Sequence, residues 1–252
     1  MIMKKAVSLL LGASLCVPLA ACREEPQIVE TTPMTHAGIT HPTEMEPHYT
    51  IPEMTAVEET TVPETVFVEL EDDALVAVKD YIPDILTELR YGSTDNFTGQ
   101  VIYGFQDAYL RYGTVKKLKN AQDAFAEVGL RLKIWDAFRP ASAQFALWDA
   151  CPDPTYVADP RKGFSNHTRG NAVDVTLVDR EGQELIMPTP FDDFSGKADR
   201  DYSDCTETET ENAIFLESVM EKNGFKGYFG EWWHFADEVR YPVEENFDPT
   251  IG

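Results

Sequence analysis

The sequence has few basic residues, and this scarcity limits the partners it can bind. Lysine and arginine together number 21 against 44 aspartate and glutamate residues, which gives a formal net charge of -23. Proteins that bind nucleic acid neutralise its phosphates with clustered lysine and arginine. The composition therefore argues against nucleic acid as a partner. Twelve of the 44 acidic residues but only three of the 21 basic residues lie before Asp73, so part of the net negative charge belongs to that segment.

Long hydrophobic runs are also scarce. The apolar run at residues 6–20 follows Lys4 and Lys5 and is too short to span a membrane comfortably, a pattern typical of an export signal. It ends in Leu-Ala-Ala-Cys, which resembles the bacterial lipobox, in which the cysteine becomes the lipidated first residue after cleavage. We therefore expect residues 1–22 to be a lipoprotein signal peptide with Cys22 as the lipidation site. An ordinary secretory signal with an incidental cysteine is the alternative.

The segment after this signal predicts an exported protein on a spacer. Residues 23–69 are rich in Thr, Pro and Glu and show little apolar periodicity, so we expect a disordered tether. The protein would then lie outside the cytoplasm and touch the membrane only through its lipid anchor. Once the signal is removed, Cys151 and Cys205 are the cysteines left in the mature domain, and in an oxidising compartment they could form a disulfide.

The rest of the chain, residues 70–252, has the patterning of one folded catalytic domain. Apolar spacing predicts helices over residues 114–128, 141–150 and 209–222, and strands over residues 130–138, 171–178 and 232–235. These elements do not alternate as regular βαβ units. We therefore expect the α+β class, with a mainly antiparallel sheet flanked by helices.

Only two histidines, His167 and His234, lie in this folded region. The first belongs to the segment S-x-H-x-x-G-x-A-x-D at residues 165–174. In the predicted strand, Asp174 lies on the face opposite to the apolar valines and leucine. Gly170 and the alanine beside Asp174 are small, so we expect open space there for an ion or a substrate. An exposed aspartate on an edge strand is the alternative.

The second histidine has a carboxylate nearby. Glu231 lies three residues before His234 among bulky aromatic residues. An apolar surrounding raises the basicity of a carboxylate, so Glu231 could act as a base beside a metal ligand. Residues three apart in an ideal strand face opposite sides, so a bend or bulge is required to bring both to one site. Alternatively, Trp232 and Trp233 simply pack in the core.

Two imidazoles and one carboxylate are the usual protein ligands of catalytic zinc, which keeps a fourth position open for water. The three ligands expected here, for one zinc ion per chain, are His167, Asp174 and His234. With Glu231 as general base, this set predicts hydrolysis of a carbonyl compound. Arg139 follows directly after a predicted strand and could stabilise the anionic transition state. A surface ion pair is the alternative role for Arg139.

Together these residues resemble a known family, the zinc D-alanyl-D-alanine metallopeptidases, and specifically the VanX-type D-Ala-D-Ala dipeptidases. The resemblance rests on S-x-H-x-x-G-x-A-x-D followed downstream by E-x-W-H, and it extends from about residue 89 to residue 235. It implies the same zinc ligands, with Glu231 as general base and Arg139 stabilising the transition state. It also implies contacts to the substrate's amino end from Tyr91, Ser165 and Asp192. The Ala-Phe before Arg139 departs from the Gly-Tyr expected there.

The resemblance implies hydrolysis of D-Ala-D-Ala to D-alanine. An exported lipoprotein lacks access to newly made dipeptide in the cytoplasm, so we expect a role in recycling wall-derived dipeptide. One alternative is a D,D-carboxypeptidase that trims peptidoglycan stem peptides. A further alternative is a non-catalytic, zinc-containing wall-binding module, against which the intact Glu231 argues. Nothing in the sequence predicts a protein partner.

The lipobox gives the first testable prediction. Replacing Cys22 with serine should abolish lipid attachment and leave unprocessed precursor in the membrane fraction, because cleavage by the lipoprotein signal peptidase requires the modified cysteine. Metabolic labelling with a radioactive fatty acid, followed by fractionation, measures both effects. Normal labelling of the Cys22→Ser protein would rule out the lipobox.

Overall fold

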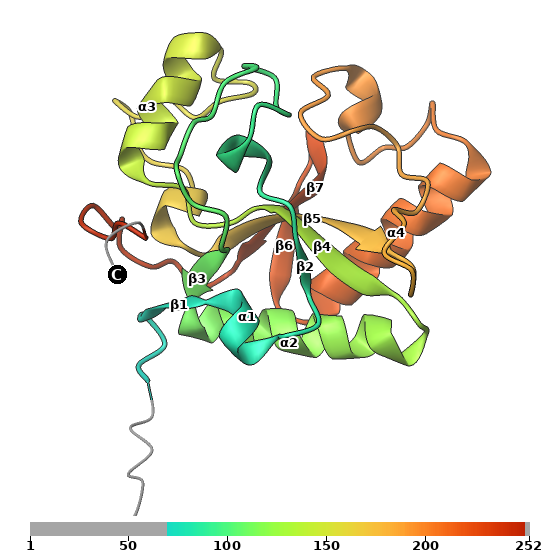
Figure 1. Cartoon of the computed structure of the whole chain (residues 1–252). Coiled ribbons are helices and arrows are strands. Elements are labelled where there is room, and N and C mark those ends of the chain that lie inside the picture. The colour runs from blue at the N-terminus through green and yellow to red at the C-terminus, as the bar shows by residue number, and fades with distance from the viewer. Residues whose placement is uncertain (1–69, 250–252) are drawn as a thin grey trace, which may run out of the picture. The chain divides into compact units, whose positions relative to one another are not determined.

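The computed structural model describes residues 70–249, which are built around a five-stranded sheet (Figure 1). The strand order is β2-β4-β5-β7-β6, and only the β2–β4 pair is parallel. The strands are β2 (Leu86–Thr87), β4 (Arg131–Asp136), β5 (Ala172–Val178), β6 (Phe225–Tyr228) and β7 (Glu231–Asp237). The expectation of an α+β domain with a mainly antiparallel sheet is confirmed.

Smaller elements complete the domain. A second, two-stranded sheet pairs β1 (Leu75–Ala77) with β3 (Tyr109–Arg111). The helices are α1 (Val78–Tyr81), α2 (Tyr112–Glu127), α3 (Ala141–Ala150) and α4 (Glu207–Lys222), and the 3-10 turns are η1 (Arg90–Gly92), η2 (His167–Arg169) and η3 (Gly196–Ala198). None of the helices in the described part of the chain is long and apolar enough to cross a membrane.

The ends of the helices follow local sequence signals. Helix α3 has the predicted bounds, because Pro140 stands at its N-cap and its fixed φ suits a helix start. Helix α4 begins two residues earlier than predicted, since Thr206 and Glu209 form a capping box in which each side chain accepts a hydrogen bond from the other's backbone N–H. Gly224, with φ of 86°, follows α4 in the left-handed conformation that commonly ends helices.

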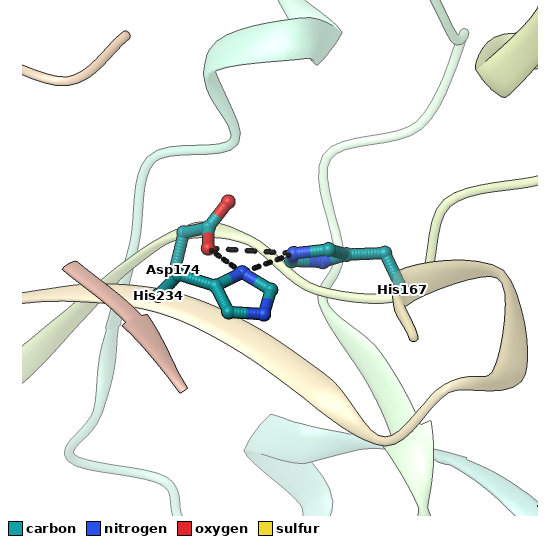
Figure 2. Close-up of side chains that lie close together, drawn as sticks. All are labelled: His167, Asp174 and His234. Atoms are coloured by element: carbon teal, nitrogen blue, oxygen red, sulfur yellow. Dashed lines mark hydrogen bonds and ion pairs between the residues drawn. The ribbon is translucent and has the colours of Figure 1, made fainter. Parts of the chain in front are cut away.

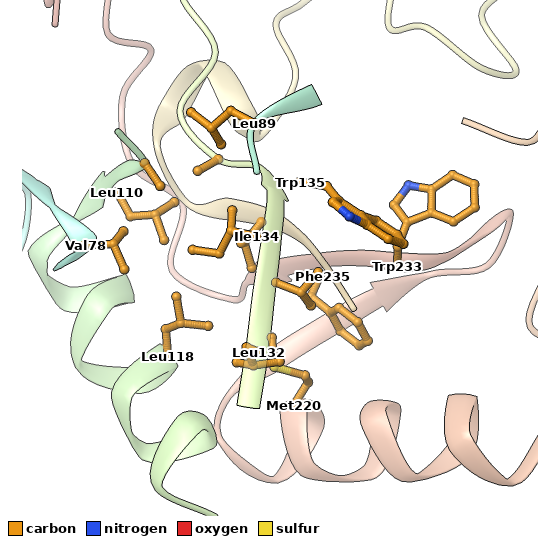
Figure 3. Packing of buried hydrophobic residues seen from close by; sticks show 14 of the residues in the cluster. Val78, Leu89, Leu110, Leu118, Leu132, Ile134, Trp135, Met220, Trp233 and Phe235 are labelled. Carbon is orange, nitrogen blue, oxygen red and sulfur yellow. The ribbon is translucent and has the colours of Figure 1, made fainter. Parts of the chain in front are cut away.

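The hydrophobic core lies between the sheet and two helices. Figure 3 shows Leu118 of α2 and Met220 of α4 pointing toward the strand that carries Leu132. Fully burying an apolar side chain of this size contributes about 1.5–3 kcal/mol. All seven residues of β5 are buried, so both faces of this central strand are covered. Helices α2 and α4 cover one face of the sheet, and the polar residues described below lie on the other.

The structure bears on the possible disulfide but not on the predicted signal peptide and tether. The possible disulfide is not formed in the structure, where Cys151 and Cys205 are both free thiols. Cys151 directly follows α3 and Cys205 precedes α4, and these helices lie on opposite sides of the molecule in Figure 1. A disulfide needs its two Cα atoms within about 7 Å. The predicted signal peptide with Cys22, and the tether at residues 23–69, lie outside the described residues.

Candidate metal centre and active site

Three adjacent strands place acidic and imidazole side chains in a row across the sheet. Asp136 of β4 is the partner of Asp174 of β5, and Asp174 is the partner of His234 of β7. Directly opposed residues of an antiparallel pair project to the same face. Since Val173 and its partner Phe235 face the core, the row lies on the opposite face. Asp174 is only 3% exposed on this central strand, so the alternative of an exposed aspartate on an edge strand is wrong.

His167 joins this row from the η2 turn. Figure 2 shows its ring pointing toward the Asp174 carboxylate and the His234 ring. The His167 Nε2 atom lies 3.3 Å from Asp174 Oδ1 and 3.1 Å from His234 Nδ1. The remaining pair, His234 Nδ1 and Asp174 Oδ1, is 2.9 Å apart. The three residues predicted as ligands therefore converge on one point and form a group that could hold a metal ion.

The orientation of His167 suits a metal ligand. Its Nδ1 lies 2.8 Å from the carbonyl oxygen of Ala137, which can only accept a hydrogen bond, so Nδ1 carries the proton. The lone pair of Nε2 is then free to face Asp174 and His234. Such a second hydrogen bond is the usual way in which proteins fix the ring of a ligating histidine. Ala137 stands where the family resemblance leads one to expect glycine. Because the acceptor is a backbone carbonyl, either residue can make this hydrogen bond with His167.

The η2 turn is itself held tightly. The hydroxyl oxygen of Ser165 accepts a hydrogen bond from the backbone N–H of His167, at 3.2 Å. Gly170 ends the turn with φ of 71°, and a Cβ atom at this position would lie 2.7 Å from the side chain of Leu75. The open space that the sequence suggested beside Gly170 is therefore absent. Glycine is required there for the left-handed conformation and for close packing.

The members of the cluster shift one another's pKa values. Burial alone would raise the pKa of Asp174, but His167 and His234 lower it instead. Likewise, burial alone would lower the pKa of His167, but the carboxylates of Asp174 and Asp136 raise it. Two imidazole nitrogens and one carboxylate oxygen are a donor set that fits zinc, and the tautomer that the Ala137 contact implies for His167 agrees with that use.

Glu231 reaches the same cavity because β7 is irregular. The β6–β7 register shifts between Gly227, the partner of Phe235, and Tyr228, the partner of Glu231. The bend that the sequence argument required is therefore present, and Glu231 Oε2 lies 3.8 Å from His234 Nδ1. Burial raises the pKa of Glu231 above its usual range. A carboxylate with a raised pKa is suited to accepting and returning a proton near neutral pH.

Arg139 is buried and paired, so its alternative role as a surface ion pair is wrong. Its Nε and Nη2 atoms both donate to Asp136 Oδ2, and Nη1 donates to Gln144 at 3.0 Å. Burial opposes the charge of Arg139, but Asp136 raises its pKa, so the guanidinium stays charged. The other oxygen of Asp136 accepts a hydrogen bond from the hydroxyl of Tyr103, at 2.8 Å. The cation is therefore fixed in place at the cavity wall.

Asp136 and Tyr103 are the residues that the sequence argument missed. The only signal for Asp136 was its place at a strand end three residues before Arg139, and none pointed to Tyr103. Asp136 Oδ2 also lies 3.4 Å from His167 Nδ1, so this one carboxylate supports both a predicted metal ligand and the cation.

A cavity of about 270 Å³ collects the predicted residues. Its walls include all eight of them: Tyr91, Arg139, Ser165, His167, Asp174, Asp192, Glu231 and His234. Sequence reasoning did not assign its aromatic wall, which contains Phe97, Tyr156, Phe194, Tyr228 and Trp233. Trp233 is also 1% exposed, so it packs in the core and lines the site at once.

Asp192 offers an acceptor without a partner. The hydroxyl of Tyr91 donates to Asp192 Oδ1 at 2.9 Å, whereas Oδ2 is buried and makes no hydrogen bond in the structure. Burial raises the pKa of Asp192 to about 7. The residue has φ of 58°, a left-handed conformation that is strained for a non-glycine residue and often occurs at functional sites. A ligand that donates a hydrogen bond or brings positive charge would satisfy Oδ2.

The fold and the cavity define a class. Two histidines and an aspartate converge on one point, a glutamate with a raised pKa lies beside them, and a fixed arginine faces the same space. This is the arrangement of a metal-dependent hydrolase.

Comparison with known proteins identifies the family within this class. The family model described as D-ala-D-ala dipeptidase matches residues 71–248. The D-alanyl-D-alanine dipeptidase of Escherichia coli K12 is 38% identical over 171 residues, which cover 67% of this chain and 88% of that protein. The enzyme of the same name from Enterococcus faecium is 30% identical over 169 residues, covering 59% and 84%. The chain belongs to the D-Ala-D-Ala dipeptidase family and is a metallopeptidase.

A solved structure also matches. The structure described as VanYB in complex with D-Alanine-D-Alanine aligns with a TM-score of 0.35 and 17% identity, over 52% of this chain and 72% of that one.

The buried pair of Asp136 and Arg139 gives the second prediction. Asp136→Asn leaves the buried guanidinium without its counter-charge and should lower the free energy of unfolding by about 3 kcal/mol. Urea denaturation without added metal measures this loss. The matched control is Asp95→Asn, because Asp95 also pairs with an arginine but its side chain is 75% exposed. The control should lose less than about 1 kcal/mol. Equal losses would contradict the role assigned to Asp136.

Proposed function

We propose that the protein is a zinc-dependent dipeptidase that cleaves D-alanyl-D-alanine outside the cytoplasm, in recycling of dipeptide released from the cell wall. The observation that carries the proposal is one small cavity that contains three chemical features. It holds the His-Asp-His group, a glutamate of raised pKa, and an aspartate oxygen without a partner. Membership of the family and the names of the relatives support the choice of substrate.

We assign the metal ligands as His167, Asp174 and His234. Their donor atoms fit zinc, and their convergence leaves the cavity side open for water and substrate. When bound, zinc would supply Lewis-acid activation of a water molecule and of the scissile carbonyl.

The chain's own residues then move the proton and stabilise the developing charge. Glu231 accepts the proton of the attacking water and returns it to the leaving amine, which its raised pKa favours. Arg139 presents a permanent positive charge to the oxyanion that forms at the carbonyl. Because Asp136 and Gln144 fix the guanidinium before the reaction, little reorganisation is needed.

The substrate's amino end pairs with Asp192 in this proposal. The free Oδ2 atom can accept from an ammonium group, and an ammonium beside it keeps the carboxylate ionised although burial favours its neutral form. Tyr91 holds the other carboxylate oxygen and so orients it. Ser165 lines the same cavity, and the resemblance to the family assigns its hydroxyl to this contact.

The location outside the cytoplasm rests on the export signal and lipobox of residues 1–22. Recycling follows from that location, because the dipeptide available there is the product of wall turnover. The lipid anchor is accordingly the proposed contact with the membrane.

Zinc content and kcat test the ligand assignment and the base assignment separately. His167→Ala should lose tightly bound zinc, because only two of the three protein ligands remain. Glu231→Ala should keep zinc but lower kcat by about 10²–10⁴-fold, since only the proton carrier is removed. Elemental analysis after dialysis and steady-state kinetics measure the two effects. Asp237→Asn, at another buried carboxylate of β7, is the control and should keep both zinc and turnover. Full zinc occupancy in His167→Ala would refute the ligand assignment.

The amino-end contact predicts the preferred substrate length. N-acetyl-D-Ala-D-Ala has an amide in place of the ammonium, so it leaves Asp192 unsatisfied in a buried site. A site built for a polar contact rejects such an analogue strongly, so we expect kcat/KM to favour free D-Ala-D-Ala by about 10⁴-fold. Asp192→Ala should narrow this ratio, mainly by slowing the free dipeptide.

The matched control for this comparison is Asp193→Ala, at the adjacent carboxylate, which accepts a hydrogen bond from the backbone of Ser195. It should leave the ratio unchanged. Comparable kcat/KM values for the two substrates in the unaltered protein would overturn the dipeptidase proposal and favour the D,D-carboxypeptidase.

A further inference from the structure

The bend in β7 leaves backbone groups that need partners. Gly227 and Tyr228 are consecutive in β6, but their partners Phe235 and Glu231 in β7 are separated by residues 232–234. Those three residues have no opposing residue in β6. Backbone carbonyls that are buried without a hydrogen bond are costly, so a bulge of this size persists only where other groups satisfy them.

The side chain of Arg200 supplies the missing partners. Its Nη2 atom donates to the carbonyl oxygens of Trp232 and His234, each at 3.0 Å. Its Nε atom donates to the carbonyl oxygen of Tyr228 at 2.9 Å. The backbone N–H of Arg200 donates to the carbonyl of Phe229, also at 2.9 Å. One residue from the loop between η3 and α4 therefore joins both strands across the register shift.

The guanidinium is itself held in place. The Arg200 side chain is 6% exposed and pairs with Glu217 of α4 at 3.2 Å, which balances its charge. Its central carbon lies over the ring of Phe235, 4.5 Å from the centroid. A fork of directed donors that also stacks on an aromatic ring is specific to arginine, and lysine cannot reproduce it.

Gly227 leaves the space that this side chain occupies. A Cβ atom at position 227 would overlap the Arg200 guanidinium, with Nε and Nη2 at 2.7 Å. The glycine is not among the residues with positive φ, so its backbone conformation would accept alanine. The requirement for glycine at this position is therefore steric and is imposed by Arg200.

We infer that Arg200 is a positioning residue, which holds the bulged segment of residues 231–234 so that Glu231 and His234 face the same cavity. Gly227 is its steric counterpart. The inference rests on the proposed function for the role of Glu231. Without the guanidinium, the carbonyls of the bulge would lose their donors, and a more regular β6–β7 pairing would turn Glu231 away from His234.

Arg200→Lys and Gly227→Ala test the inference from two sides. The first removes the donor fork, and the second displaces it. Each should lower kcat for D-Ala-D-Ala by about 100-fold, because small displacements of reacting groups have effects of that size. KM should change much less, since Tyr91 and Asp192 belong to other segments. In both variants, the amides of residues 228–236 should exchange hydrogen faster by mass spectrometry.

A double-mutant cycle isolates the steric link. In an Arg200→Ala background, the space around Gly227 is empty, so adding Gly227→Ala should change kcat little further. If the kcat losses of Arg200→Ala and Gly227→Ala multiply in the double variant, as independent effects would, the inference is overturned. If Gly227→Ala alone does not fold, the double variant should fold as Arg200→Ala does, and failure of the double variant to fold would equally overturn it.

The control for general destabilisation is Asp237→Asn, which removes the charge of a buried carboxylate that pairs with Lys117 at the other end of β7. It should lower the Tm but leave kcat and the exchange of residues 228–234 unchanged. Equal loss of kcat in the control would refute a specific role for Arg200. Absence of D-Ala-D-Ala hydrolysis by the unaltered protein would instead refute the proposed function, while hydrogen exchange would still test the contact between Arg200 and the bulge.

Discussion

The register between β4, β5 and β7 is the constraint on which the rest of the site depends. It places Asp136, Asp174 and His234 opposite one another, with a register shift in the β4–β5 pair between Ile134 and Asp136. A slip of one residue would move the entire polar row to the helix-covered face and expose Val173 and Phe235. Because burial of those apolar residues opposes the slip, the hydrophobic core fixes the geometry of the metal centre.

Several carboxylates are concentrated around the cavity, where water is scarce. Asp136, Asp174, Asp192 and Glu231 all lie in or against one small cavity, and such groups are costly to bury unless each is paired. Arg139 satisfies Asp136, and the two imidazoles satisfy Asp174. The remaining pair, Asp192 and Glu231, have raised pKa values because burial is not fully compensated. These incompletely compensated carboxylates are the two that we assign to substrate and proton.

Local sequence signals predicted only part of this arrangement. The ligands, Glu231 and Arg139 stood out because few residue types can supply that chemistry and because strand periodicity fixed the face of Asp174. Elements between residues 75 and 111 were not predicted, since strands of two or three residues show no periodicity. The roles of Asp136, Gly170 and Arg200 depend on contacts between segments far apart in the chain, as does the absence of a disulfide, and no local pattern encodes such contacts.

The residues that we assign to the reaction and those that we assign to substrate selection lie in different parts of the fold. Of the residues that we assign to the reaction, Asp174, Glu231 and His234 lie on strands β5 and β7. His167 and Arg139 lie outside the strands, but hydrogen bonds to Ala137 and Asp136 hold their side chains beside the sheet. Asp192 and Tyr156, by contrast, lie in connecting segments, where substitutions disturb the core less. Changes in those segments can therefore alter which amino end enters the cavity without moving the metal ligands. Arg200 also lies in a connecting segment, but its contacts with β7 hold the strand that carries Glu231.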